Sequence, residues 1–146
     1  MPVFVSTRDC RSPTLATCVR RGGTRLLAAL RMPDAELSVV LASDSVMRTL
    51  NGKYRGRDRT TDVLSFPQQE GEGGAPEGLL GDVVISLPVA RRQAKERGVR
   101  LGEEGERLLV HGVLHLLGYD HERSPAEARR MQRRERTLIR MLREQR

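Results

Sequence analysis

Residues 111–121 have the sequence HGVLHLLGYDH, and this segment contains every histidine of the 146-residue chain. On an α-helix, His111 and His115 lie one turn apart on the same face, because side chains four residues apart stack along the axis. Gly118 is suited to end that helix with a left-handed turn, which would bring His121 back towards the other two rings. We therefore predict that the three imidazoles bind one metal ion per chain.

Zinc is the metal that this ligand set favours. Three neutral imidazoles leave one tetrahedral position open for water, which is typical of catalytic rather than structural zinc sites. They also leave the dipositive charge uncompensated, which lowers the pKa of bound water and attracts an anionic oxygen such as that of a phosphodiester. Nickel, copper and cobalt also accept nitrogen ligands. Asp120 either orients an imidazole or the water, or is only a turn residue.

A peptidase is one alternative, because the spacing H-x-x-x-H-x-x-G-x-x-H also occurs in the metzincins. Those enzymes have a glutamate after the first histidine as the general base, whereas this chain has Gly112. Met131 falls inside a helical pattern, so a Met-turn is not evident either. Glycine inside a helix costs about 1 kcal/mol relative to alanine, and we therefore predict a close backbone approach at Gly112.

The rest of the chain predicts an α+β protein. Strands are expected at residues 2–6, 36–41, 62–66 and 79–87, and the last two would form a hairpin around the glycine-rich loop 68–78. Helices are expected at residues 13–30, 43–51, 88–97, 103–117 and 125–143, and Asn51-Gly52 would end the second of them. We expect residues 1–146 to form a single compact domain, with a small mixed sheet packed against helices. The metal site would lie on a helix of the C-terminal half and the turn after it.

Composition limits the classes of protein that are compatible with the chain. The 31% charged and 38% hydrophobic residues are ordinary for a globular domain. No apolar run reaches the ~20 residues of a membrane span and no secretory pattern opens the chain, so a cytoplasmic protein is expected.

The net charge is +7, and all 26 basic residues except Lys53 and Lys95 are arginine. This excess fits a polyanionic partner, although a general arginine preference explains it equally well. Cys10 and Cys18 are expected to be structural thiols.

Three segments together resemble one known family. Residues 111–121 resemble the signature HGxLHLxGYDH of the YbeY family of bacterial endoribonucleases. Residues 51–67, NGKYRGRDRTTDVLSFP, resemble the stretch before that family's central strand, and residues 80–85, LGDVVI, resemble the strand that follows.

This resemblance implies a zinc-dependent, single-strand-specific endoribonuclease that acts in 16S ribosomal RNA 3′-end maturation and ribosome quality control. It implies ribosomal RNA precursor as substrate and the small ribosomal subunit or its associated proteins as partners. Arg55 matches the family's functionally important arginine, so Arg55 and His111 are the candidate catalytic residues. A guanidinium at Arg55 could bind the substrate phosphate and stabilise charge that develops on it.

Several alternatives remain open from the sequence. A non-catalytic RNA-binding assembly factor with a structural metal would have the same basic composition, and a zinc metallopeptidase is less favoured. Asp62, Ser65 and Asp82 could make hydrogen bonds at the sheet or line a cleft. Tyr54, Phe66 and Tyr119 could stack on a base or pack in the core.

Overall fold

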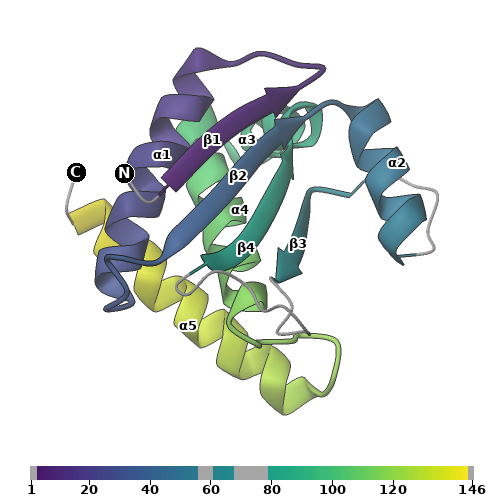
Figure 1. Cartoon of the computed structure of the whole chain (residues 1–146). Coiled ribbons are helices and arrows are strands. Elements are labelled where there is room, and N and C mark those ends of the chain that lie inside the picture. The colour runs from purple at the N-terminus through teal and green to yellow at the C-terminus, as the bar shows by residue number, and fades with distance from the viewer. Residues whose placement is uncertain (1–2, 56–60, 68–78, 145–146) are drawn as a thin grey trace.

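The computed structural model describes residues 3–55, 61–67 and 79–144 (Figure 1). Its strands are β1 (Val3–Arg8), β2 (Glu36–Ala42), β3 (Val63–Pro67) and β4 (Leu79–Ser86). Its helices are α1 (Pro13–Ala29), α2 (Asp44–Arg55), α3 (Leu87–Arg97), α4 (Leu101–Leu116) and α5 (Pro125–Glu144). The predicted α+β class with a small mixed sheet is confirmed.

The sheet has the strand order β1-β2-β4-β3. β1 and β2 are parallel, β2 and β4 are parallel, and β3 is antiparallel to β4. The predicted pairing of the third and fourth strands is therefore confirmed, while loop 68–78 between them lies outside the described residues. The connection between β1 and β2 contains α1, which packs on α4, so these two helices cover the same side of the sheet (Figure 1).

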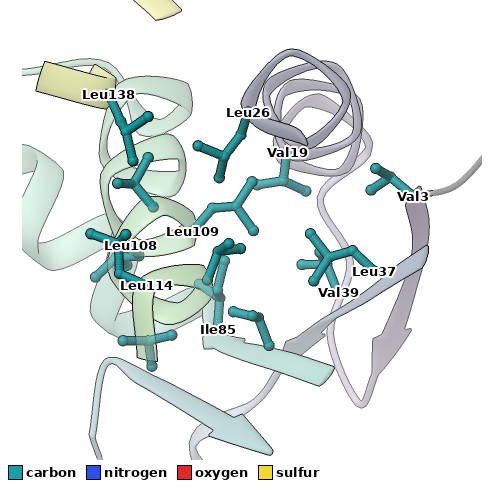
Figure 2. Close-up of a cluster of buried hydrophobic side chains, with 14 of the residues drawn as sticks. Val3, Val19, Leu26, Leu37, Val39, Ile85, Leu108, Leu109, Leu114 and Leu138 are labelled. Atoms are coloured by element: carbon teal, nitrogen blue, oxygen red, sulfur yellow. The ribbon is translucent and has the colours of Figure 1, made fainter. Parts of the chain in front are cut away.

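Helix α4 is at the centre of the core. It packs on β3 and β4 and also contacts α1, α3 and α5. Figure 2 shows Leu109 of α4 among side chains of α1 and β2, and Leu109 is fully buried. The other side of the sheet has a smaller cluster, which α2 covers with Met47 and which contains Ala42, Leu64 and Val84. Within the described ranges, no helix has the length and apolar composition needed to cross a membrane.

Glycines allow α4 to approach its neighbours closely. A Cβ atom at Gly112 would lie 2.7 Å from Val83 Cγ1, and one at Gly105 would lie 2.4 Å from Leu15 Cδ1. The close approach predicted for Gly112 is therefore present. Gly23 serves α1 in the same way, since its Cβ would lie 3.1 Å from Val3 Cγ1, and α1 continues through this residue without interruption.

The prediction that α2 ends at Asn51-Gly52 is wrong. Ser43 does cap the helix, since its Oγ accepts a hydrogen bond from the Val46 amide at 3.2 Å, but the helix continues to Arg55. Asn51 is only 2% exposed. The tertiary environment that buries Asn51 outweighs the weak local preference of Asn-Gly to end a helix.

Candidate metal centre

Two of the three histidines come from α4, and the third comes from the turn that follows it. His111 and His115 are one turn apart on the helix, which ends at Leu116. Gly118 has φ +98°, a conformation that favours glycine, and its amide donates to the His115 carbonyl at 3.0 Å. The Tyr119 amide donates to the Leu114 carbonyl at 3.0 Å, so the chain reverses direction and brings His121 back to α4.

The three rings converge in the way a metal ion requires. One ligand atom from each histidine lies within 4.8 Å of the others, and His111 Nε2 is 3.2 Å from His115 Nε2. Two nitrogens bound to one tetrahedral zinc at about 2.0–2.1 Å would be roughly 3.3 Å apart. The residues present therefore fit a metal ion held by three imidazole nitrogens.

Burial favours the neutral form of His115, which is the form that a metal ligand requires. Its pKa is below the ordinary value, chiefly because of desolvation and then because of the nearby His111 and His121 rings. A neutral imidazole has the free lone pair that a metal ligand must supply.

Acidification is expected to release the metal. The shifted pKa of His115 stabilises the native apoprotein fully above about 6.5, the pKa of an unperturbed histidine. That contribution decreases as the pH falls from 6.5 towards the lower native pKa, because the unfolded chain binds its proton first. Protons also compete with the metal for the same nitrogens. Metal content after dialysis and the Tm of the apoprotein, measured from neutral to acidic pH, should both decrease. Metal content unchanged well below pH 6.5 would contradict histidine ligation.

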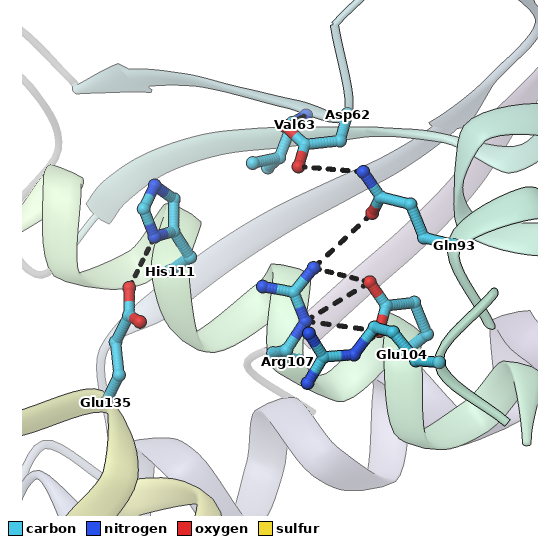
Figure 3. Close-up of polar contacts among 8 residues, drawn as sticks. Asp62, Val63, Gln93, Glu104, Arg107, His111 and Glu135 are labelled. Carbon is cyan, nitrogen blue, oxygen red and sulfur yellow. Dashed lines mark hydrogen bonds and ion pairs between the residues drawn. The ribbon is translucent and has the colours of Figure 1, made fainter. Parts of the chain in front are cut away.

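A carboxylate from α5 completes the surroundings of His111. Glu135 Oε1 contacts His111 Nδ1, as Figure 3 shows, and both side chains are partly buried. If Nδ1 carries the proton and donates it to this carboxylate, the Nε2 lone pair points at the other two histidines. We did not predict Glu135 from the sequence. It is 24 residues from His111, and one glutamate in an arginine-rich helix has no distinguishing pattern.

A second polar network supports α4 one turn before His111. Glu104 is 1% exposed, and its carboxylate accepts from Arg107 Nε at 3.1 and 3.2 Å. This hydrogen bonding raises the pKa of Arg107. Arg107 also donates to Gln93 at 3.4 Å, and Gln93 donates to Asp62 at 3.5 Å (Figure 3). The network therefore connects α4 to α3 and to the residue that precedes β3.

The three histidines line an open cleft of about 570 Å³. Ser65 lines it from β3, and its hydroxyl donates to the Gly112 carbonyl at 2.8 Å, which ties the strand to α4.

Asp62 and Tyr119 also line the cleft, and the guanidinium of Arg130 lies 5.0 Å from the Tyr119 ring centroid. Asn51 and Thr61 line the cleft as well, and neither of them was predicted as a site residue from the sequence.

Asp120 has the geometry of the turn residue. Its carboxylate accepts from the Glu122 amide at 2.8 Å, and this hydrogen bond is the main reason why its pKa is low. Asp82 lies in the middle of β4 and pairs with Ser38 and Phe66. Phe66 packs against the cluster beneath α2, which favours the core-packing alternative for this side chain.

Arg55 is the last residue of α2, and it follows Asn51 of the cleft by one helical turn. The side chains of Arg55 and Tyr54 lie outside the described residues. The proposed phosphate contact of Arg55 therefore stays a prediction.

Residues 7–143 match the family model described as endoribonuclease YbeY. The chain belongs to this family. It is 50% identical to endoribonuclease YbeY of Anaeromyxobacter sp. (strain Fw109-5), across 96% of this chain and 71% of that protein. It is 46% identical to endoribonuclease YbeY of Geobacter metallireducens, across 97% and 96% of the two chains. The solution structure of TM1509 from Thermotoga maritima has the same fold, with a TM-score of 0.67 and 24% identity over 96% of this chain and 88% of that one.

Proposed function

We propose that this YbeY family member is a zinc-dependent endoribonuclease specific for single-stranded RNA. The observation that carries the proposal is the convergence of three imidazoles at an open cleft, in a chain 46–50% identical to proteins named endoribonucleases. A bound zinc ion would supply Lewis-acid stabilisation of phosphate charge and a low pKa for its water. Residues 1–146 would act as one catalytic domain in the cytoplasm, where the RNA substrate is found.

The protein side chains would hold and orient the reacting groups. His111, His115 and His121 would be the metal ligands, through one ring nitrogen each. Arg55 would bind the phosphate as a bidentate donor. The Ser65–Gly112 hydrogen bond would hold β3 and α4 at a constant separation, so that the wall of the cleft formed by β3 keeps its position.

Glu135 would be a positioning residue for His111. Its carboxylate fixes the tautomer and orientation of the ring, and such partners of ligating histidines typically contribute 10–100-fold to metal affinity.

Replacing Glu135 with glutamine is expected to lower zinc affinity by about 10–100-fold, because the negative partner of the His111 ring is lost. Competition with a chromogenic chelator measures this affinity without reference to activity. Glu144→Gln is the matched control, since it removes the same charge from an exposed site on the same helix. If Glu135 had a purely structural role, Glu135→Gln would lower the Tm of the apoprotein and would bind zinc as tightly as the control variant does.

We further propose ribosomal RNA precursor as the natural substrate, with cleavage at the 3′ end of 16S RNA, and the small ribosomal subunit as the place of action. Family membership supports this assignment. A non-catalytic assembly factor would bind the same RNA without cutting it, so RNA binding alone does not distinguish the two.

The decisive experiment is single-turnover cleavage of a precursor fragment. Metal-loaded protein should cut the single strand, whereas the same RNA annealed to its complement should remain intact. Chelator-treated protein should be inactive and should recover with zinc. Metal-loaded protein as inactive as the His115→Ala variant would contradict the nuclease assignment. Elemental analysis of protein purified without chelators or nickel resin tests the identity of the metal.

A further inference from the structure

Helix α5 has a continuous row of arginines on its outward face. Residues 129, 133, 136, 140 and 143 recur at intervals of four and three, so they lie on one side of the helix. All five are exposed, and the buried residues Met131, Leu138 and Leu142 lie on the opposite side. The row consists of Arg129, Arg133, Arg136, Arg140 and Arg143, and we call it the arginine stripe. At 1.5 Å per residue it is about 21 Å long.

The neighbouring residues that the structure describes do not neutralise the positive charge of the stripe. Among the described residues, no carboxylate forms an ion pair with any of its five guanidinium groups. Two of the three glutamates on α5 are engaged elsewhere, because Glu127 pairs with Arg123 at 3.5 Å and Glu135 contacts His111. Like charges on neighbouring turns repel one another, so a stripe of this kind costs folding free energy in the unbound protein.

The groove beside the stripe extends the positive surface. Its volume is about 400 Å³, and three stripe residues line it together with residues of α3 and α4. Two of its three glutamates already have arginine partners: Glu104 is 3.2 Å from Arg97, and Glu106 is 3.8 Å from Arg25. The carboxylates in the groove are therefore largely occupied by other cations, and the stripe arginines remain available to an external anion.

The stripe begins next to the cleft. Arg123 lines the cleft, α5 starts at Pro125, and the first stripe residue follows one turn later. Figure 1 shows α5 running away from this end along the side of the molecule. A strand that leaves the cleft at Arg123 can therefore continue along the outer face of α5.

We propose that the arginine stripe binds the phosphate backbone of single-stranded RNA outside the cleft. This inference rests on the proposed function, since it takes RNA as the substrate. Guanidinium groups suit phosphate because they donate paired hydrogen bonds. The average axial spacing of about 5 Å between stripe residues is of the order of the separation between successive phosphates in one strand. The stripe would add affinity for long RNA independently of sequence, with a strong dependence on salt.

The test compares two triple variants that each remove three positive charges. In the stripe variant, Arg133, Arg136 and Arg140 become glutamine; in the control variant, the exposed residues Arg21, Arg91 and Arg92 become glutamine. Binding is measured by anisotropy with 2′-O-methyl RNA of about 30 nucleotides, which is long enough to extend beyond one binding site. The slope of log affinity against log salt should become less steep by about 2 in the stripe variant, roughly 0.7 for each phosphate that the stripe no longer neutralises.

The outcomes separate the stripe from the catalytic site. A slope and affinity equal to those of the control variant would overturn the proposal and would leave an acidic polypeptide as the remaining partner for the stripe. An RNA of about four nucleotides should be cut equally by the wild type and both variants, because it fills only the cleft. Failure of every protein to cut any RNA would contradict the proposed function, whereas the binding slopes would still test the stripe. A cooperative thermal unfolding transition in each variant would show that both are folded.

Discussion

Replacing His115 with alanine is expected to abolish zinc binding and to reduce RNA cleavage by on the order of a thousandfold, since the charge stabilisation that a metal supplies is worth several kcal/mol. His115 is the candidate ligand whose ring nitrogen lies 3.2 Å from that of His111, and its loss leaves only two imidazoles. Elemental analysis and single-turnover cleavage measure the two effects separately.

Leu116→Ala is the matched control for this variant. Leu116 is the next residue of the same turn and is partly buried against the core, so its truncation disturbs packing without removing a ligand. It should lower the Tm and keep one zinc per chain. A His115→Ala protein that retained stoichiometric zinc would contradict the three-histidine site, whatever its activity.

Introducing glutamate at Gly112 is expected to destabilise the protein by about 4 kcal/mol or more and to confer no peptidase activity. A Cβ there would lie 2.7 Å from Val83 Cγ1 and 3.2 Å from Val63 Cγ2, in the packed layer between α4 and the sheet. The change therefore adds overpacking to the burial of an unpaired carboxylate. Urea unfolding with a constant m-value measures the loss of stability.

Gly112→Ala separates the steric part of that effect from the charge. Helix propensity alone predicts that alanine stabilises α4 by about 1 kcal/mol, whereas the contact with Val83 predicts a loss of about 1–3 kcal/mol. The Gly112→Ala/Val83→Ala double variant should be less destabilised than the sum of the single variants, because Val83→Ala removes the clashing methyl group. Additive losses, or a stabilised Gly112→Ala protein, would contradict the close packing of α4 on β4.

The local signals in the sequence were sufficient for most of the secondary structure. Ser12 followed by Pro13 is typical of a helix start and agrees with the helix predicted at residues 13–30, and the Ser12 hydroxyl accepts from the Leu15 amide at 3.2 Å. Ser124 caps α5 in the same way, since its Oγ accepts from the Glu127 amide at 3.1 Å. Such caps involve residues only three or four positions apart, so they can be recognised from the sequence alone. At Asn51-Gly52 the local signal was misleading, because α2 continues to Arg55 and Asn51 is buried within the fold.

The three histidines of the candidate metal centre were predictable because they lie within one short segment of the chain. The i, i+4 spacing of His111 and His115 and the glycine turn before His121 are properties of eleven consecutive residues. Helix geometry alone places His111 and His115 on the same face, whatever the rest of the fold. Family membership was likewise evident from short motifs.

Only the tertiary structure decided which distant residues meet that segment. The contact of Glu135 with His111, the bond from Ser65 to Gly112 and the connection from Asp62 to Glu104 join elements that are far apart in the chain. Such contacts depend on how α4 packs between the sheet and α5, and packing depends on the shapes of many side chains at once rather than on a local pattern. The sequence by itself therefore predicted the three candidate ligands and the helix that carries two of them. The packing decided which carboxylate contacts His111, which strand forms a wall of the cleft, and which side of α5 presents the arginine stripe to solvent.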